Sequence, residues 1–306
     1  MKITISVIIP THNRPELLKR ALQSVLKQTL TPYEVIVVDD VGCTKTKTIV
    51  ESMNSHLVMY VHNIAGIGAA SSRNLGIEYS SGDYVAFLDD DDEFKTNKIE
   101  VLTREIKSNP DFDVFYHPAH INMVNEGISY YSKPYIFKEN DDIFRALLTQ
   151  NFIGGTPMVV VRKQSLIDAK LFDEQLPALE DYDLWLKLAK NKCYFKYINS
   201  ALTNYYYTTK TKSISKDLKK HTQALNKIEN KYYNERFNLS KKEKKIYNEW
   251  RYRMNIHKAL LNGQYFTALK YQLRLCLYSP TIKNIFSLLV VMLGPKLVFK
   301  LKSKIG

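Results

Sequence analysis

Cysteine is scarce in this chain of 306 residues, which contains only Cys43, Cys193 and Cys276, far apart from one another. An odd number of cysteines cannot form a complete set of disulfides, and their separation does not match metal-ligand spacing. We therefore expect a protein of a reducing compartment, and the cytoplasm fits best.

Long hydrophobic runs are absent as well. The longest apolar stretch, residues 285–293 (IFSLLVVML), contains one serine and is ended by Gly294 and Pro295. It is well short of the roughly 20 residues that a membrane-spanning helix needs, so no such helix is predicted. The opening residues, MKITISVIIPTHN, lack the long apolar core and cleavage site of a signal peptide, so export is not expected.

Acidic residues are few in the last third of the chain. Residues 210–306 contain 22 Lys or Arg and 5 Asp or Glu, a net charge of +17, which leaves −4 for residues 1–209 of a chain whose net charge is +13. This asymmetry predicts a basic appendage that meets a polyanion, either nucleic acid or an anionic membrane surface. A solvated, lysine-rich helical face is the simpler alternative.

What the chain does contain is an alternation of buried strands and helices. Apolar, β-branched runs predict strands at residues 5–10, 33–40, 56–63 and 83–92, and helical spacing predicts helices within residues 11–28 and 68–82. Strands that alternate with helices predict an α/β fold whose parallel sheet has helices on both faces.

The alternation of strands and helices becomes less clear after residue 97 and is clear again from residue 154. In the weaker part we expect a helix to residue 108, a strand at 112–117, turn-rich residues up to 138 and a helix near 141–149. From residue 154 onward the pattern gives a strand, a short helix, a loop and a second helix. Beyond residue 209 the chain is mostly helical and rich in lysine, so a boundary near 210 is drawn from charge alone.

Two of the predicted strands end in acidic residues, at Asp39–Asp40 and at Asp89–Asp92, and Thr11 follows the strand at residues 5–10. Ligands of such sheets bind at the carboxyl ends of the strands, so we expect these side chains to form one site. Mg²⁺ or Mn²⁺ prefers one or two carboxylates together with phosphate oxygens of a substrate, which fits a nucleoside diphosphate.

A calcium loop or a solvated turn explains the acidic run DDDDEF less well than a site for a divalent ion and a nucleoside diphosphate does. A calcium loop would need glycine at its sixth position, where Phe94 stands, and a helix before it, where we predict a strand. A solvated acidic turn would account for an isolated run, but not for its convergence with Asp39 and Asp40.

Glu180 and Asp181 stand at the start of the helix predicted after residue 178. Acidic residues there are often present only because they interact favourably with the helix dipole. A nucleotide-sugar transferase, however, also needs a base that takes a proton from the hydroxyl of the sugar acceptor. Glu180 and Asp181 lie downstream of Gly154 and Gly155, in the half expected to hold that acceptor, which favours a catalytic base instead.

Five segments, SVIIPTHNRPELLKRALQSVLKQT, EVIVVDD, SSRNLG, GDYVAFLDDDD and LEDYDLWLKL, lie in this order between about residues 3 and 198. Together they resemble the family 2 glycosyltransferases, inverting enzymes with the GT-A nucleotide-sugar fold. The resemblance implies a mainly parallel central sheet flanked by helices, with a role in bacterial surface-glycan assembly. It also implies a catalytic domain at residues 1–209, with a nucleotide-binding half (1–100) and an acceptor half (101–209), and a helical basic extension at residues 210–306.

The resemblance assigns the nucleotide to the first half of the chain. It implies that Pro10, Thr11 and Asp40 contact the nucleobase, with Asp39 beside it. Arg73 would lie near the base or the phosphates, because its planar fork suits either.

The resemblance also implies the metal ligands and the base. Asp89 and Asp91 match the D-x-D motif, with Asp91 a direct ligand of Mn²⁺ or Mg²⁺ and Asp89 directed toward the ribose and the metal. Asp90 would adjoin the nucleotide, but the resemblance does not fix the roles of Asp90 and Asp92, one of which is expected only to shape the loop. Asp181, with Glu180 next to it, matches the general base.

The implied reaction is a single displacement. The base deprotonates an acceptor hydroxyl, which attacks the anomeric carbon of a nucleoside-diphosphate sugar, by the resemblance a UDP-sugar, and inverts its configuration. One segment departs from the family: VVDDVGC lacks the Ser/Asn-rich turn that usually follows the paired acids. The contacts on the ribose side are therefore not predicted.

The last residues, 279–306, combine the apolar stretch with lysines, the pattern of a segment in an anionic membrane interface. A helix packed on the catalytic domain is the alternative. A tail on the membrane surface would bring the enzyme to a glycan or lipid-linked glycan acceptor. We therefore expect a peripheral protein on the inner face of the cytoplasmic membrane that adds one or a few sugars.

Three further functions fit the sequence less well. Tyr and Trp interleaved with Lys in KIENKYYNERF and KKIYNEWRYRM are compatible with nucleic-acid binding, but the acidic half would repel a polyanion, so no nucleic acid partner is expected. A nucleotidyltransferase should have a glycine-rich loop after its first strand, and IPTHNRPE contains no glycine. An inactive scaffold would have no need to keep Asp91 and Asp181.

Overall fold

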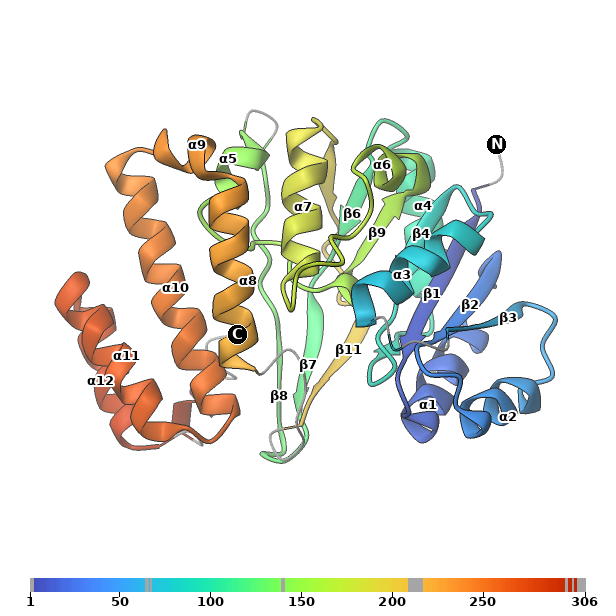
Figure 1. Ribbon diagram of the computed structural model, residues 1–306, viewed down its shortest axis with the longest axis horizontal. Coiled ribbons are helices and arrows are strands. Elements are labelled where there is room, and N and C mark those ends of the chain that lie inside the picture. The colour runs from blue at the N-terminus through green and yellow to red at the C-terminus, as the bar shows by residue number, and fades with distance from the viewer. Residues whose placement is uncertain are drawn as a thin grey trace.

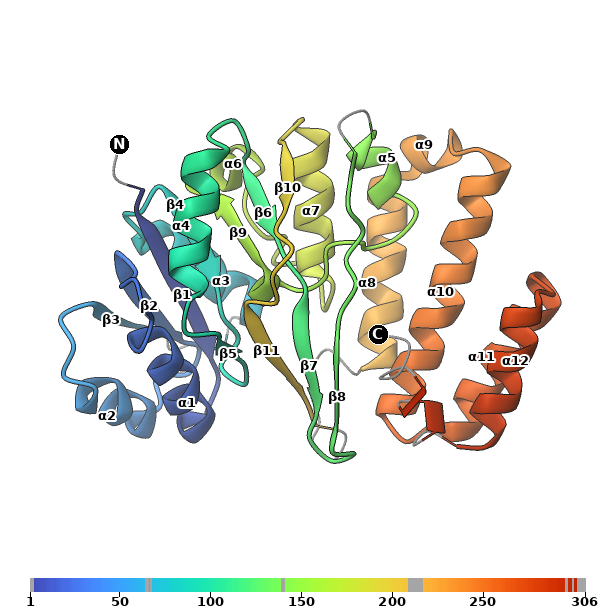
Figure 2. The same ribbon diagram turned by 180° about the vertical axis from the view of Figure 1, so that it is seen from behind.

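The computed structural model describes residues 3–63, 66, 68–138, 141–208, 217–294, 297–298 and 300–301. Figure 1 shows a sheet with helices on both faces at one end, a second and smaller sheet in the middle, and a group of helices at the other end. Figure 2 shows the same parts from behind.

The main sheet has seven strands in the order β10-β6-β9-β4-β1-β2-β3. All neighbours are parallel except β9, which is antiparallel to both β4 and β6, so the predicted mainly parallel sheet is confirmed. The strands are β1 (Ile5–Thr11), β2 (Glu34–Asp39), β3 (Val58–His62), β4 (Tyr84–Phe87), β6 (Val114–Tyr116), β9 (Val159–Arg162) and β10 (Phe195–Tyr197).

Helices cover both faces of this sheet, as predicted. Ile8 and Ile36 point into one apolar cluster and Val7 and Val35 into another, which is why the strands are almost continuously apolar. The cluster with Val7 lies under α1 (Pro15–Leu26), α2 (Thr44–Ser52) and α4 (Lys98–Ser108), the helices in front in Figure 2. The cluster with Ile8 lies under α3 (Gly68–Tyr79), α6 (Lys163–Asp168) and α7 (Glu180–Lys190).

A glycine sets the distance between α3 and the sheet. A Cβ at Gly76 would lie 2.5 Å from Cγ2 of Ile8, so a larger residue would push α3 away from β1. The close contact fixes the helix that carries Arg73.

The prediction of turn-rich residues up to 138 is wrong, because this region contains strands of a second sheet. Its order is β5-β11-β7-β8, and its strands are β5 (Glu93–Phe94), β11 (Thr203–Tyr207), β7 (Ala119–Met123) and β8 (Ile128–Tyr131). β7 alternates buried and half-buried residues, the pattern of a strand with only one face in the core. β5 continues the acidic run and pairs with β11, so the second sheet holds the end of the acidic loop.

The residues after Gly154 follow the predicted order. A 3₁₀ turn, η1 (Thr156–Met158), leads into β9, and α6 and α7 follow. The helix expected near residues 141–149 is α5 (Ile143–Leu147).

The basic extension is helical, as predicted, and shares its core with the preceding part of the chain. One apolar cluster contains residues of the main sheet, α7 and the later helices, and the ring of Trp250 lies 5.5 Å from that of Tyr182 on α7. An ion pair of 2.5 Å joins Arg145 of α5 to Glu243, which with Ser240 caps α10. The helices are α8 (Leu218–Lys231), α9 (Tyr233–Phe237), α10 (Lys241–Leu261), α11 (Tyr265–Tyr278) and α12 (Ile282–Met292).

The shared core means that the extension is packed on the preceding part of the chain. The boundary placed near residue 210 falls on residues 209–216, which lie outside the described residues. In the described ranges, no helix is both long enough and apolar enough to cross a bilayer.

Candidate active site

The predicted convergence of the strand ends is confirmed. Thr11 ends β1, and its hydroxyl donates a hydrogen bond of 2.8 Å to Asp90, which follows β4. Pro10 pairs in register with Val38 of β2, one residue before Asp39. Because the three strands are parallel neighbours, their carboxyl ends form one edge, and the acidic residues gather there.

Asp39 is fully buried and holds the turn after β2. Its carboxylate accepts hydrogen bonds from the backbone N–H groups of Val41 and Cys43, at 3.2 and 2.8 Å, and from the hydroxyl of Tyr60, at 2.8 Å. These bonds engage both of its oxygens, so Asp39 fixes the loop beside the site.

Asp40 connects this loop to α3. One oxygen accepts a hydrogen bond of 3.0 Å from the N–H of Gly68 at the start of α3, and Ser72 lies 3.4 Å away. The other oxygen lies 3.0 Å from Nδ1 of His12, whose ring is mostly exposed. His12 was not predicted as a site residue, because a single histidine after a strand carries no motif.

Arg14 at the start of α1 neutralises part of the acidic run. Its guanidinium donates to Asp90 at 3.2 Å and to Asp91 at 3.3 Å. Partial burial, together with the nearby charges of Asp89 and Asp90, raises the pKa of Asp91 to about 6. With 39% of its side chain exposed, Asp91 is open to a cation that would relieve this repulsion.

Asp89 and Asp91 are the two carboxylates that the sequence predicts to hold a divalent ion. In the described part of the chain, no cluster of three or more His, Cys, Asp or Glu side chains has the geometry of a complete metal site. Mg²⁺ is typically held by one or two carboxylates plus phosphate oxygens, and Asp91 and Asp89 are carboxylates of this kind.

Asp92 faces the protein interior and shapes the loop. One oxygen accepts a hydrogen bond of 2.9 Å from the N–H of Tyr206 on β11, and the other has no hydrogen-bond partner among the described residues. Burial and the charges of Asp89 and Asp91 raise its pKa well above the usual value. Asp92 thus ties the acidic loop to the second sheet.

Arg73 joins the two halves of the site. Its guanidinium donates to Asp89 at 2.7 Å and to Glu180 at 2.8 Å, and the residue is only 5% exposed. Asp89 follows β4, whereas Glu180 opens α7, so the arginine connects two elements that are far apart in the sequence. The sequence predicted both residues for the site but gave no sign that one arginine bridges them.

Asp181 lies beside this bridge. Burial and the adjacent charge of Glu180 raise its pKa to about 7, although Arg73 opposes the shift. Leu179 precedes α7 with a φ of 61°, a conformation that costs a residue with a side chain about 1 kcal/mol and turns the chain abruptly into the helix. A Cβ on Gly155 would lie 3.7 Å from Oδ2 of Asp181, so the glycine leaves room around the carboxylate.

The basic extension contributes Lys258 to the surroundings of Asp181. Lys258 lies on α10 and is 7% exposed, and burial lowers its pKa to about 8 against the opposing charges of Asp181, Asp217 and Glu180. The ring of the preceding residue, His257, lies 6.0 Å from that of Tyr207 on β11, which places this turn of α10 against the second sheet. Sequence reasoning missed Lys258 because it is one of many lysines in the extension.

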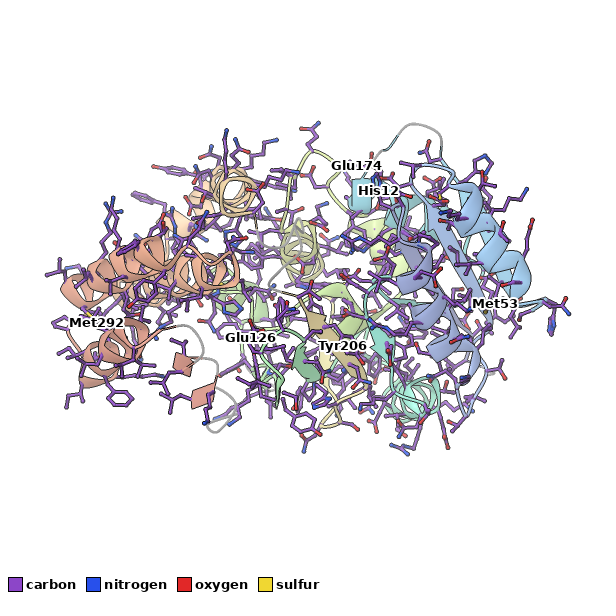
Figure 3. All side chains as sticks on the ribbon, turned by 90° about the horizontal axis from the view of Figure 1, so that it is seen from below. His12, Met53, Glu126, Glu174, Tyr206 and Met292 are labelled. Carbon is purple, nitrogen blue, oxygen red and sulfur yellow. The ribbon has the colours of Figure 1, made fainter. Side chains whose placement is uncertain are left out.

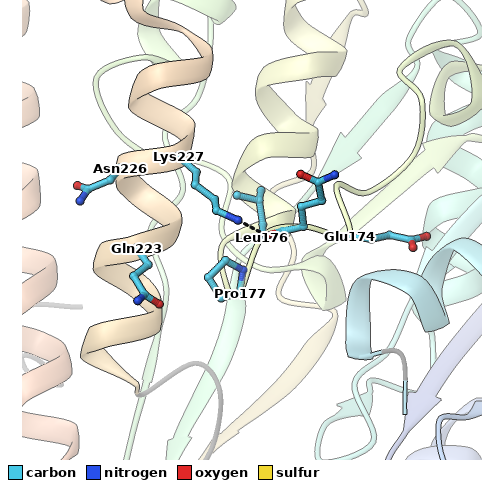
Figure 4. A pocket seen from close by; sticks show the side chains of 7 residues that line it. Glu174, Leu176, Pro177, Gln223, Asn226 and Lys227 are labelled. Carbon is cyan, nitrogen blue, oxygen red and sulfur yellow. Dashed lines mark hydrogen bonds between the residues drawn. The ribbon is translucent and has the colours of Figure 1, made fainter. Parts of the chain in front are cut away.

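A pocket lies apart from the carboxylates. It has a volume of about 520 Å³ between α8 and the loop of residues 174–177, where Lys227 donates a hydrogen bond of 2.7 Å to the carbonyl of Gln175 (Figure 4). None of the acidic residues at the strand ends, and neither Glu180 nor Asp181, lines this pocket.

A mainly parallel sheet with helices on both faces, and with acidic residues gathered at its carboxyl edge, is the architecture of the GT-A fold. Residues 6–172 match the family described as "Glycosyl transferase family 2", and the chain belongs to this family. The resemblance noted in the sequence is thereby confirmed, and the protein is a glycosyltransferase rather than a nucleotidyltransferase.

Two relatives named as glycosyltransferases and one solved structure are similar to this chain. An uncharacterized glycosyltransferase of Haemophilus influenzae is 33% identical over 303 residues, which are 97% of this chain and 98% of that protein. The GalNAc(5)-diNAcBac-PP-undecaprenol beta-1,3-glucosyltransferase of Campylobacter jejuni is 29% identical over 66% of this chain and 64% of that protein. The crystal structure of S. aureus TarS 1–349 in complex with UDP-GlcNAc has a TM-score of 0.57 at 19% identity and covers 88% of this chain and 89% of that one, which supports the fold.

Proposed function

We propose that this glycosyltransferase moves a sugar from a nucleoside-diphosphate sugar to a hydroxyl of a glycan, with inversion at the anomeric carbon. The observation that carries the proposal is the bridge of Arg73 between Asp89 and Glu180. It holds the acidic loop, where a nucleoside diphosphate would bind, next to Asp181.

The donor is a UDP-sugar in this proposal. TarS, which has the same fold, is recorded in complex with UDP-GlcNAc. Pro10, Thr11 and Asp40 line the edge at which the nucleobase would lie, while Asp39 and Asp90 hold the loops around it.

Mn²⁺ or Mg²⁺ would be held by Asp91, with Asp89 as second carboxylate. The bound ion would neutralise the diphosphate and stabilise it as a leaving group. Asp89 would also keep its ion pair with Arg73, so the charge of the loop remains balanced.

Asp181 is the general base of the proposed reaction. A carboxylate with a pKa of about 7 is an effective proton acceptor at neutral pH, and burial makes the proton transfer more favourable. It takes the proton from the acceptor hydroxyl as the oxygen forms its bond to the anomeric carbon and the bond to the diphosphate breaks. Glu180, fixed by Arg73, positions the first turn of α7 for this step.

The acceptor is a lipid-linked glycan in this proposal. The Campylobacter relative is named for an undecaprenol-diphosphate-linked glycan. An acceptor anchored in this way places the enzyme at the inner face of the cytoplasmic membrane, as a peripheral protein that works in the assembly of surface glycans such as lipopolysaccharide or capsule.

A panel of nucleotide sugars tests the proposal. Purified protein is incubated with each donor in Mn²⁺, Mg²⁺ or EDTA, and the release of nucleoside diphosphate is measured. We expect release from a UDP-sugar that requires the ion and is lost in Asp91→Ala but kept in Glu78→Ala, a matched change of an exposed acid. Equal release in EDTA or from Asp91→Ala would contradict the metal site, and no release from any donor would contradict the reaction.

A further inference from the structure

An apolar surface covers α11 and α12, and we call it the α11–α12 face. Its residues are large, apolar and 55–88% exposed: Phe266, Leu277, Ile282, Phe286, Leu289 and Met292. On α12 they recur at intervals of three and four residues and form one continuous stripe. A contiguous apolar patch on a protein surface usually marks an interaction site.

The orientation of α12 is fixed by polar contacts on its other side. Asn284 is fully buried, and its amide donates a hydrogen bond of 2.7 Å to the carbonyl of Ser279 and accepts one of 2.9 Å from Arg253 on α10. Gln272 of α11 donates to the carbonyl of Asn284 at 2.9 Å. Turning α12 inward would break these buried hydrogen bonds, so its apolar side stays at the surface.

The charge around this face is of one sign. Residues 265–292, which span α11 and α12, contain three Lys or Arg and no Asp or Glu. Lys270 and Arg274 are exposed between the apolar residues of α11, and Lys283 is exposed in the first turn of α12. Apolar side chains surrounded by cations are typical of surfaces that lie in an anionic lipid interface.

The position of the face leaves the nucleotide-binding strands free. Figure 1 shows α11 and α12 at the end of the molecule opposite to β3. Figure 3, from a perpendicular direction, also places Met292 at the end far from Met53. Binding through this face would therefore keep the donor side in contact with the solvent.

We infer that the α11–α12 face binds the surface of an anionic phospholipid bilayer, with its apolar residues in the interface and its cations on the lipid phosphates. A second copy of the chain is a poorer occupant, because it would bring two basic surfaces with no acidic residues face to face. The inference rests on the membrane-bound acceptor of the proposed function and identifies the surface that reaches that membrane.

Vesicle flotation tests the inference. Full-length protein is mixed with phosphatidylglycerol–phosphatidylcholine vesicles or with phosphatidylcholine vesicles alone, without donor. We expect binding to the anionic vesicles that weakens only in part at high salt, because salt does not screen the apolar contacts.

Two sets of variants separate the apolar and ionic contributions. F266Q, L277Q and I282Q combined should lose binding, whereas Val124→Gln, Ile136→Gln and Ile167→Gln combined, which change exposed apolar residues elsewhere, should not. Lys270→Gln, Arg274→Gln and Lys283→Gln combined should weaken binding to anionic vesicles by about fivefold for each charge removed. Melting temperatures close to that of the wild type show that the variants fold.

The outcomes distinguish this inference from the proposed function. Release of nucleoside diphosphate in solution without vesicles should be the same in the wild type and the apolar variant. If the protein bound vesicles but released no nucleoside diphosphate, the proposed reaction would be wrong, while membrane binding by the α11–α12 face would stand. The inference would be wrong if the wild-type protein did not bind anionic vesicles. It would also be wrong if the wild type were a dimer and the apolar variant a monomer.

Discussion

Replacing Asp181 with asparagine tests both the chemistry and the electrostatics of the site. Asparagine keeps the shape of the side chain and can still accept the hydrogen bond of 2.7 Å from the N–H of Tyr182, but it cannot take a proton. Loss of a general base typically lowers kcat by about 10² to 10⁴, which corresponds to roughly 3 to 5 kcal/mol of barrier. Donor affinity should stay close to that of the wild type, because the base faces the acceptor.

The same change should stabilise the protein above neutral pH. Asp181 has a pKa of about 7 in the folded chain, against an ordinary value of 3.8, so the folded state holds this proton more tightly. The free energy of unfolding therefore falls as pH rises from about 4 to 7, by up to about 4 kcal/mol for a shift of this size. Asparagine removes this cost, so Asp181→Asn should melt several degrees above the wild type at pH 8 and at nearly the same temperature at pH 4.

The assays are donor hydrolysis for kcat, calorimetry with UDP for affinity, and thermal melting between pH 4 and 8. Glu78→Gln, which changes an exposed acid on α3, serves as the control and should alter none of the three. Turnover close to wild type in Asp181→Asn, or a melting difference that does not depend on pH, would refute the reasoning.

Further substitutions examine the metal ligand, the nucleotide site and the extension. Asp91→Ala should abolish metal-dependent release of nucleoside diphosphate, whereas Asp92→Asn should keep measurable activity. Similar activities of the two variants in a Mn²⁺ titration would contradict the assignment of Asp91 as metal ligand and Asp92 as a residue that shapes the loop. Asp40→Ala should raise the Kd for UDP about tenfold and change kcat less, as measured by calorimetry and kinetics, because it removes a contact made in the ground state. Lys258→Met should shift the acidic limb of the pH–rate profile to higher pH, because losing the cation raises the pKa of the base Asp181. Lys245→Met, on the exposed side of α10, should leave the acidic limb unchanged.

The main sheet was predictable because its strands are buried on both faces. Continuous apolar runs such as that of β1 are typical of strands covered on both sides, and the parallel order then brings the strand ends, and with them Thr11 and Asp90, to one edge. The helix α2 was not predicted, because only Thr46 and Val50 of its residues are buried and its apolar pattern is short.

The second sheet and the contacts of the site were harder to foresee. β8 and β11 consist mainly of half-buried or exposed residues, whose weak alternation resembles that of a loop. The bridge made by Arg73 joins residues that are 107 positions apart, and Lys258 comes from a helix without a motif. Such pairs depend on how the elements pack, which single-sequence patterns do not encode.

A crystal structure of the full-length protein with UDP and Mn²⁺, with the ion located by its anomalous signal, tests the central claim most directly. We expect a manganese peak at the carboxylate of Asp91 that also contacts the diphosphate, and the uracil ring beside Thr11 and Asp40. A diphosphate bound in the pocket between α8 and residues 174–177, or a manganese peak away from Asp91, would contradict it.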